Sequence, residues 1–453
     1  MSPASPGPSL PRPVRSITRY LSDLAALYGP QQLSQDEPSD PATQGFVDPL
    51  IEQLHRTGDM PSGMITDLAD YTAQQLLSGY LEGYQTPLFG PSWTEQDNAL
   101  LTRTRHNFFA FSGAKTYAQM REMAAAVYDA EGHLVPWDQY RRRALQINSR
   151  YNLTYLEAER QAVIAAGTQG SRWVEIEATR STHPYLEYVT ARDSHVREEH
   201  RPLDGIVLPV DDPFWDAYYP PNGWRCRCTT RRLTARQADR MKKIDSETAQ
   251  KIGGRATTKM WRRNVGTSEV FSPDVHPYFR ASERAKISQL SAVKDYGMPS
   301  VERIYSRPSR LSQYRKGLDG VEQYTRYWQQ MATRHPAADG DGFSLIDSSR
   351  KVMAHFDDAL RQKIEQRGRW DYFDEAARIF EQPDEVWGIE KSGKGNHTKK
   401  EYFTAYVRYY QDSPVLLIVN ASGRVDSFYR WGNGNDLRNF EDWRKGVLLY
   451  KKR

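Results

Sequence analysis

Cysteines, long apolar runs and an excess of charge of one sign are all scarce in this chain. Two cysteines among 453 residues make a disulfide framework untenable and fit synthesis in a reducing cytoplasm. No apolar run approaches the ~18 residues of a membrane span, and the N-terminus lacks an apolar signal core, so we expect no membrane contact. The net charge of +5 is too small to demonstrate contact with nucleic acid, although it does not exclude it.

Length and pattern predict an α+β multidomain chain. Residues 1–44 carry many prolines and polar residues, which favours a disordered or polyproline arm with one short helix near residues 17–28. Residues 45–235 read as a mostly helical domain that ends in an irregular Cys/His motif, and residues 236–342 as a mixed tail and linker. Residues 343–453 read as a separate α+β domain with an antiparallel sheet.

Apolar residues recur at helical spacing almost throughout residues 46–180. They form three stripes, which are typical of the packed faces of a helical bundle. Thr154 followed by Glu157 fits a capping box and predicts a new helix start there. Nothing in this segment indicates catalysis. The stripes are Leu68, Tyr71, Leu77, Tyr80, Leu81 and Tyr84; then Tyr117, Met120, Ala124, Val127 and Tyr128; then Trp137, Tyr140, Ala144 and Ile147.

The segment 182–234 contains both cysteines and many turn residues. A short strand is predicted at 186–190, and one or two helical turns at 193–201. Five prolines between 202 and 221 then make regular structure unlikely, so the loop needs other groups to hold it. One such group is an aromatic cluster under the loop. Its expected members are Phe214, Trp215, Tyr218, Tyr219 and Trp224.

A metal is the second means of holding this loop. The thiolates of Cys226 and Cys228, with His200 or His195, are ligands of the kind that zinc selects in tetrahedral sites. However, Cys-x-Cys is not the usual Cys-x-x-Cys spacing, and two small, partly buried cysteines are the alternative. A disulfide between them would be strained.

The same segment resembles the phage Mu F-like head morphogenesis proteins, the minor capsid family of tailed phages. The resemblance extends upstream to residues 107–115, 121–123 and 151–152, and it covers roughly residues 60–235. Other members carry further cysteines and histidines near the positions of Arg197 and His200, which implies a metal site. Because Arg197 is no ligand, the fourth ligand here is His195, Asp193 or a water. The matching pieces are Asp193, Arg197, His200, residues 203–205, 212–215, 219–224 and 226–228.

The C-terminal segment reads as helices followed by a meander. Val352, Met353, Phe356, Leu360 and Ile364 predict one helix, and Asp371 opens a second. Five short strands are predicted at 386–390, 402–410, 415–420, 424–431 and 447–451. This layout, with residues 383–387, 406–409 and 444–450, resembles the barnase, EndoU, colicin and RelE-like nuclease modules attached to phage head proteins.

The second resemblance implies RNA cleavage without a metal. That reaction needs a base for the ribose 2′-hydroxyl, an acid for the leaving oxygen and a cation for the phosphate. We expect the candidate groups to converge on one face, with His355 on the first predicted helix. For most of them, a solvated surface position is the alternative. The candidates are His355, Arg408, Ser427, Arg430, Lys445 and Tyr450.

Together the two resemblances imply a minor head protein whose C-terminal domain is a ribonuclease-like toxin or effector. We expect portal and capsid proteins, RNA and an immunity protein as partners, and the virion as the location after synthesis in the bacterial cytoplasm. The alternative is a structural connector whose C-terminal domain binds a partner and cleaves nothing. Zinc-dependent catalysis at the central motif has the least support, because no water-activating group stands in a recognised spacing to the ligands.

Overall fold

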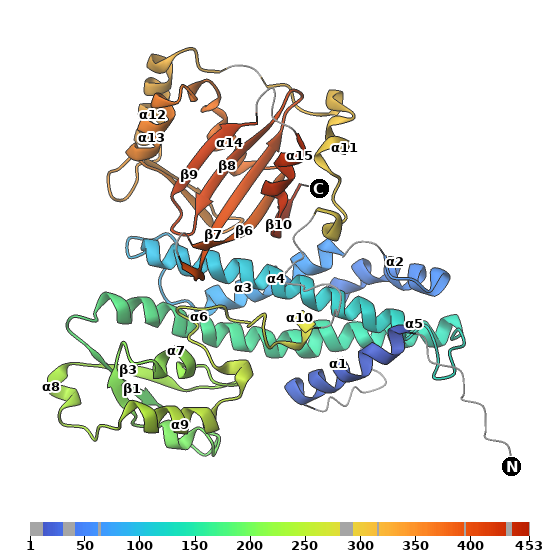
Figure 1. Cartoon of the computed structure of the whole chain (residues 1–453), viewed down its shortest axis with the longest axis vertical. Coiled ribbons are helices and arrows are strands. Elements are labelled where there is room, and N and C mark those ends of the chain that lie inside the picture. Colours follow the sequence, from blue (N-terminus) through green and yellow to red (C-terminus); the bar gives the residue numbers. More distant parts are fainter. Residues whose placement is uncertain are drawn as a thin grey trace. The chain divides into compact units, whose positions relative to one another are not determined.

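The computed structural model describes residues 12–29, 41–61, 65–280, 293–314, 317–393, 396–431 and 437–452 (Figure 1). Residues 1–11 and 30–40 of the predicted N-terminal arm therefore lie outside the described residues. The chain forms two compact units: residues 1–85 with 110–288, and residues 86–109 with 289–453. Within the described residues, no helix combines the length and the apolar character that crossing a membrane would need.

The first unit is a helical bundle, as predicted. The predicted helix near residues 17–28 is confirmed, although it begins at residue 12 and so includes part of the expected arm. The apolar stripes of the other helices are largely buried. The long helices are α1 (Arg12–Tyr28), α2 (Pro41–Thr57), α3 (Thr66–Gly83), α4 (Glu95–Ala125), α5 (Trp137–Ser149) and α6 (Leu156–Ala178).

One detail of the bundle differs from the sequence-based prediction. The residues around Thr154 form a π-helical segment, η1 (Arg150–Tyr155), which connects α5 directly to α6. No side chain caps the start of α6, so the predicted capping box is wrong. Thr154 and Glu157 have the right spacing, but the preceding residues are already helical and satisfy the backbone donors themselves.

A charged pair lies inside this bundle. Lys115 and Glu159 form an ion pair and are 1% and 0% exposed. The hydroxyl groups of Tyr28 and Tyr278 donate to Glu159 Oε1 over 2.7 and 3.1 Å. Burial raises the pKa of Glu159, and the contact with Lys115 opposes that shift. Because every charge here is paired, α1, α4, α6 and the segment near residue 278 are held in one arrangement.

The central motif forms a small three-stranded sheet in the order β2-β1-β3. The predicted strand is confirmed as β1 (Tyr185–Val189). The expectation of no regular structure after residue 202 is wrong for two short elements, β2 (Val207–Pro209) and α7 (Phe214–Tyr218), since β1 supplies the partner that β2 needs. The other elements are η2 (Arg201–Leu203), β3 (Thr229–Leu233), α8 (Ala235–Ala238), α9 (Ser246–Ala256), η3 (Lys259–Trp261) and α10 (Pro277–Arg280).

The second unit contains the predicted antiparallel sheet. All five strands of the predicted meander are present, and the sheet order is β10-β6-β7-β8-β9. The strands are β6 (Glu385–Gly393), β7 (Asn396–Tyr409), β8 (Pro414–Asn420), β9 (Val425–Arg430) and β10 (Val447–Lys451). The accompanying helices are η5 (Val293–Tyr296), α11 (Val301–Tyr305), η6 (Pro308–Arg310), α12 (Val321–Arg334), α13 (Asp358–Gln366), η7 (Trp370–Tyr372), α14 (Glu375–Glu381), α15 (Leu437–Phe440) and η8 (Glu441–Arg444).

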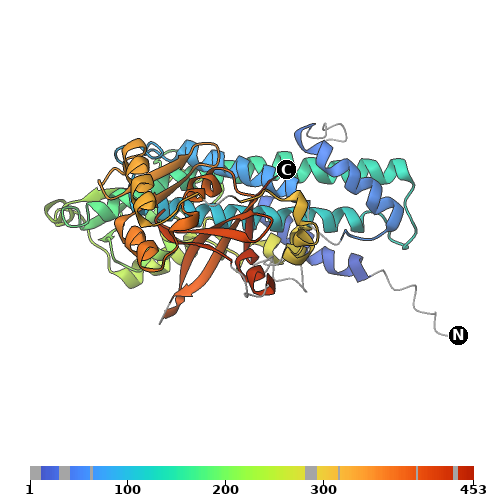
Figure 2. The same ribbon diagram turned by 90° about the horizontal axis from the view of Figure 1, so that it is seen from above.

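The first predicted helix of this domain is wrong over its N-terminal half. The residues around His355 form a hairpin of β4 (Phe343–Asp347) and β5 (Val352–Phe356), and α13 begins only at Asp358. The apolar spacing from 352 to 364 fits a helix, but pairing with β4 overrides it. Helices α12 and α13 lie at the β9 edge of the sheet (Figure 2).

The pairing register of the strands shows which residues lie on each face of the five-stranded sheet. Tyr406 pairs with Val386 and Leu417, and its ring lies 5.2 Å from that of Phe380 on α14. Directly paired residues point to the same side of a sheet, so this side is the covered face. The opposite side, which carries Phe403 and Tyr429, is called the aromatic face.

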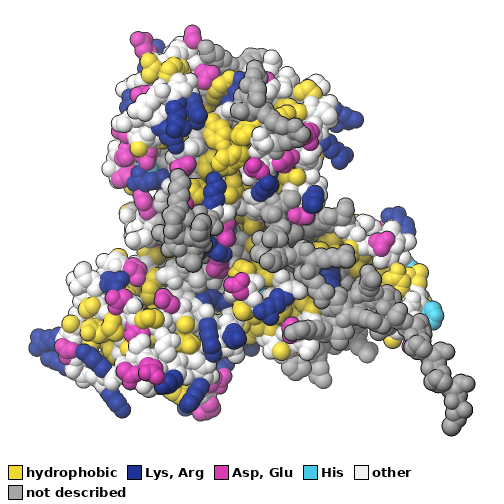
Figure 3. Space-filling model, viewed as in Figure 1, with side chains coloured by type: hydrophobic (Ala, Val, Ile, Leu, Met, Phe, Trp, Pro, Cys, Tyr) yellow, Lys and Arg dark blue, Asp and Glu magenta, His cyan; other side chains and the backbone are white. Residues whose placement is uncertain are grey.

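Figure 3 shows hydrophobic side chains over the middle of this sheet, with Lys and Arg side chains beside them.

The crossing of α3 and α6 yields a prediction about stability. A Cβ atom on Gly167 would overlap the carbonyl oxygen of Tyr80, and one on Gly83 would overlap that of Ile164. Gly167→Ala should therefore lower the free energy of unfolding by about 1–3 kcal/mol, even though alanine favours helices. Gly45→Ala on α2 meets no atom within 4 Å and is the matched control. Urea denaturation checks this, and equal stability of the two variants would contradict it.

Candidate functional site

The central motif brings three of its predicted ligands together. His200 precedes η2, and both cysteines precede β3. His200 Nδ1 lies 3.9 Å from Cys226 Sγ and 3.8 Å from Cys228 Sγ. All three residues are buried, and their ligand atoms lie within 4.8 Å of one another. The arrangement is that of a group that can hold a metal ion.

The other predicted ligands are placed differently. Asp193 is bound by Arg227 through two contacts of 2.6 and 2.7 Å, so its carboxylate is already committed. His195 is exposed and is not part of the three-ligand group, although it lines the same cavity of about 20 Å³. A cavity of that size has room for about one water. Arg197 donates to the backbone oxygen of Trp224, as expected for a residue that is no ligand.

The two thiols share their hydrogen-bonding environment. A hydrogen bond from Cys228 is the main cause of a lowered pKa at Cys226, and His200 and backbone amides contribute to it. The same contact raises the pKa of Cys228, because a thiolate next to it disfavours a second one. One thiolate is therefore favoured even before a metal binds.

Most of the predicted aromatic cluster lies under the loop. Phe214, Trp215, Tyr218 and Tyr219 are buried, and the Tyr219 ring lies 4.8 Å from that of Trp173. Trp224 is elsewhere: its ring lies 4.9 Å from Trp261, and its Nε1 donates to the Leu27 carbonyl over 2.9 Å. The loop is therefore held by two separate sets of contacts: the four buried rings beneath it, and the contacts of Trp224 with Trp261 and Leu27.

In the C-terminal domain the six candidate residues do not converge on one face. Arg408 and Arg430 lie on the covered face by register, and Arg408 donates to the Gln382 carbonyl. The Tyr450 ring lies 5.5 Å from the Arg350 guanidinium, on the same side.

Arg430 is bound by Tyr372, Asp412 and Ser413. These contacts use hydrogen-bond donors of the Arg430 guanidinium within the fold, and the contact with the Gln382 carbonyl does the same for Arg408.

His355, Ser427 and Lys445 occupy other positions. His355 lies on β5, at the end of the hairpin, with Nδ1 3.0 Å from Ser344 Oγ. Lys445 is exposed and pairs with Asp442. Ser427 is paired with Ile418, which places it on the aromatic face.

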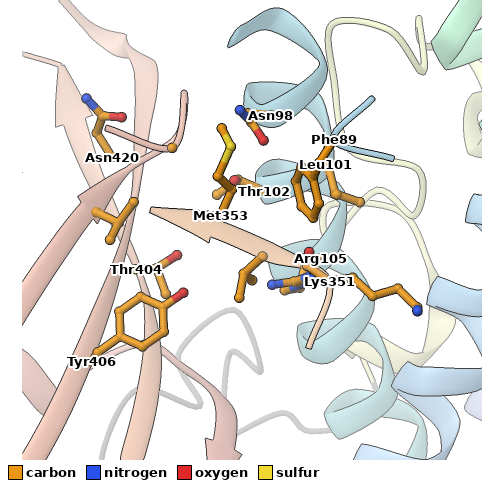
Figure 4. Close-up of a pocket in the computed structure, with 13 residues that line it drawn as sticks. Phe89, Asn98, Leu101, Thr102, Arg105, Lys351, Met353, Thr404, Tyr406 and Asn420 are labelled. Atoms are coloured by element: carbon orange, nitrogen blue, oxygen red, sulfur yellow. The ribbon is translucent and has the colours of Figure 1, made fainter. Parts of the chain in front are cut away.

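The covered face offers little room for a substrate. Its cavity, shown in Figure 4, is lined by residues of α4, β5, β7 and β8, and its volume is about 20 Å³. Arg105 donates to the carbonyl oxygens of Arg350 and Lys351, and Thr102 donates to that of Ala421 over 3.1 Å. Burial lowers the pKa of Arg105 to about 10. This space suits a water molecule and excludes a nucleotide.

The aromatic face carries a row of cations and rings in the order Arg369, Tyr429, Trp443, Lys391 and Phe403. The Arg369 guanidinium lies 5.9 Å from the Tyr429 ring, and that ring lies 5.9 Å from the Trp443 ring. Lys391 Nζ lies 4.8 Å from the Trp443 ring and 5.2 Å from the Phe403 ring. The rings are half-exposed and both cations are exposed. Such a surface can stack bases and neutralise phosphates.

A lysine, a serine and an aspartate meet at the β9 edge of this face. Lys363 on α13 donates to the Asp426 carbonyl over 2.6 Å and lies 3.2 Å from Ser427 Oγ. Ser427 Oγ in turn lies 3.1 Å from Asp426 Oδ2. A carboxylate and an ammonium group this close can serve as a base and an acid.

A buried ion pair supports the other half of the face. Arg444 binds Glu385 through two hydrogen bonds of 2.7 Å, and the two side chains are 0% and 4% exposed. Trp387 Nε1 also donates to Glu385 over 2.7 Å, and Arg444 contacts Glu441 at 3.1 Å. These contacts fix η8, the segment that carries Trp443, against β6.

Sequence reasoning missed most of these residues. Arg369, Lys391, Tyr429 and Trp443 are far apart in the chain, and only the register of the sheet brings them together. A signal was available in Tyr429 and Trp431, two aromatic residues at strand spacing just before a glycine- and asparagine-rich stretch of sequence.

Two segments of the chain match known families. Residues 114–231 match the family described as Phage Mu protein F like protein. Residues 337–451 match the family described as phage-Barnase-EndoU-ColicinE5/D-RelE like nuclease2. Both resemblances inferred from the sequence are therefore confirmed: the chain contains a Mu F-like domain and a domain of this nuclease-like family.

Two curated relatives match short stretches. The putative capsid assembly protein F of Escherichia phage Mu is 44% identical over 64 residues, 14% of this chain and 15% of the relative. The Mu-like prophage FluMu F protein of Haemophilus influenzae is 45% identical over 51 residues, 11% of this chain and 12% of the relative. The chain thus spans under a sixth of the length of these relatives. No solved structure matches the chain significantly.

Proposed function

We propose that this chain is a head morphogenesis protein of a tailed phage whose C-terminal domain binds and cleaves RNA. The first half of the proposal is supported by the Mu F-like match and by a relative named as a putative capsid assembly protein. The second half is supported by the nuclease-like family match and by the aromatic face. The protein would reside in the virion and contact portal and capsid proteins.

Zinc is the proposed metal of the central motif. The donor set of one imidazole and two thiolates matches a zinc site with three protein ligands, and a water in the adjoining cavity would be the fourth ligand. The ion would fix the loop before β3, and we assign it no catalytic step. Tyr188, which contacts Cys228 and accepts a hydrogen bond from Asn222 over 3.0 Å, would orient that ligand.

The proposal of RNA binding rests on the row of cations and rings on the aromatic face. A single strand laid along it would stack bases on Tyr429, Trp443 and Phe403, while Arg369 and Lys391 contact phosphates. Stacking is worth about 1–3 kcal/mol per base, enough to hold a strand despite the small net charge of the chain.

We place the cleavage chemistry beside this row. Asp426 would take the proton of the ribose 2′-hydroxyl as that oxygen attacks the neighbouring phosphorus. Lys363 would give a proton to the leaving 5′-oxygen, and Arg369 would stabilise the charge on the phosphorane. Ser427 bridges Lys363 and Asp426 and would position both. No step uses a metal. Of the six candidates from the sequence, only Ser427 has a role here.

In the host this activity would make the domain a toxin or effector that an immunity protein controls. A structural connector whose C-terminal domain binds a partner without catalysis is the rival function. Expression of the full chain beside its Lys363→Met variant separates the two, because a ribonuclease arrests growth only with its catalytic lysine and a binding domain does not arrest growth in either form.

The head assignment predicts that purified particles contain this chain. Mass spectrometry of virions from an induced lysogen should detect peptides from both halves, because the Mu F-like domain and the nuclease-like domain are one polypeptide. Particles that lack the chain after purification would remove the structural half of the proposal.

The zinc assignment predicts that replacing His200 and replacing His195 have different effects on the zinc content of the chain. Elemental analysis should find zinc in the purified chain, and Cys226→Ser or His200→Ala should contain about one zinc less per chain and have a lower melting temperature, since metal binding and folding share one free energy. His195→Ala should keep the metal, because we assign the fourth position to water. A folded wild-type chain without zinc would reject the assignment.

The ribonuclease assignment predicts cleavage of single-stranded RNA by the full chain in excess chelator. Lys363→Met and Asp426→Asn should each slow cleavage ~100- to 10,000-fold, the usual loss of a general acid or base. Arg361→Met, on the same helix as Lys363, should retain the rate. Trp443→Ala should raise KM more than it lowers kcat, since it removes a stacking contact.

Intact RNA with a folded chain would favour the structural connector. Cleavage that Lys363→Met leaves unchanged would move the active centre away from the β9 edge.

A further inference from the structure

A second group of potential ligands lies at the end of the β4–β5 hairpin. One atom each from Asp341, His355 and Asp357 lies within 4.8 Å of the others. These residues come from three places: the loop before β4, the strand β5 and the N-cap position of α13. Asp341 Oδ1 already accepts from the Asp358 amide over 2.9 Å, and Asp357 Oδ1 accepts from the Leu360 amide over 2.8 Å. Both carboxylates are therefore held in place.

His355 supplies an observation independent of the acidic residues. It is 6% exposed, and its buried Nε2 has no hydrogen-bond partner among the residues that the structure describes. Asp339 Oδ2 lies 3.8 Å from Nε2, beyond hydrogen-bond distance. The other ring nitrogen, Nδ1, lies 3.0 Å from Ser344 Oγ. When Nδ1 donates to that hydroxyl, Nε2 presents its lone pair, which is the usual arrangement of a metal-binding histidine.

We propose that Asp341, His355 and Asp357 form a second cation site, which binds a first-row divalent ion such as manganese or zinc. One imidazole with two carboxylates suits these ions better than magnesium or calcium, which prefer oxygen ligands alone. Bonds of about 2.1 Å place neighbouring ligand atoms about 3.0–3.4 Å apart, so the three side chains, whose ligand atoms lie within 4.8 Å of one another, would draw closer on binding an ion.

The local charge favours a cation here. Glu95, Asp339 and Asp357 all contact the guanidinium of Arg424, and Asp341 lies beside Asp357. Arg424 contacts Asp357 at 3.0 Å and Asp339 at 3.7 Å, so it offsets part of the repulsion and leaves the cluster negative. A bound ion would tie the loop before β4 to the start of α13.

This site is independent of the proposed RNA cleavage. It lies on the helix that carries Lys363, but the ion would stabilise the start of that helix and take part in no chemical step. Binding to the folded state alone would raise stability by mass action.

Manganese titration of the full chain, followed by electron paramagnetic resonance of the free ion, tests the proposal. Manganese avoids thiolate ligands, so the central motif does not interfere. Wild-type protein should bind about one ion, which zinc displaces and equimolar magnesium does not. Asp341→Asn and His355→Gln should each weaken binding at least ~10-fold.

Asp358→Asn is the matched control, because its carboxylate is exposed, adjacent to Asp357 and outside the group. It should bind manganese as the wild type does. Asp357→Asn keeps the helix cap, since asparagine caps as well as aspartate, and so tests the ligand if His355→Gln fails to fold. No binding at millimolar manganese, or equal affinity in wild type, Asp341→Asn and Asp357→Asn, would overturn the site. His355 would then be a partner of Asp339 only.

Discussion

The buried ion pair between Arg444 and Glu385 is the contact on which the proposed RNA-binding face depends. A guanidinium that is fully removed from water is stable only with a well-aligned carboxylate, and Glu385 provides two parallel hydrogen bonds. This pairing fixes η8 on the sheet and places Trp443 between β6 and β9. The rings of Tyr429 and Trp443 and the ammonium of Lys391 can form one row only because this segment is held there.

The same principle operates in the helical unit. Lys115 and Glu159 are buried together, and the tyrosines around them satisfy the remaining acceptor positions of the carboxylate. Paired buried charges restrict each unit to one packing arrangement. In the central motif, one imidazole and two thiols take this role, and a metal would complete their coordination.

The sequence predicted those parts of the fold that follow from local pattern. The five strands of the C-terminal sheet are short runs rich in apolar and aromatic residues between turn residues, and the helices of the bundle have clear apolar stripes, so both were found. The β4–β5 hairpin was missed because residues 352 to 364 also fit a helical period, and pairing with residues 343–347 is a tertiary effect. The π-helical join near Thr154 has no counterpart in simple periodicity.

The two candidate sites also differ in how much of each the sequence could predict. His200, Cys226 and Cys228 were found because ligand type and a family motif mark them. The cations and rings of the aromatic face belong to segments between residues 363 and 443, and only register unites them.

Photo-crosslinking of the full chain to an RNA whose cleavage is blocked by 2′-deoxy substitution tests the central claim most directly. Crosslinked peptides should contain Phe403, Tyr429 or Trp443, the rings of the aromatic face. Crosslinks confined to other parts of the chain, with this face unlabelled, would contradict the account.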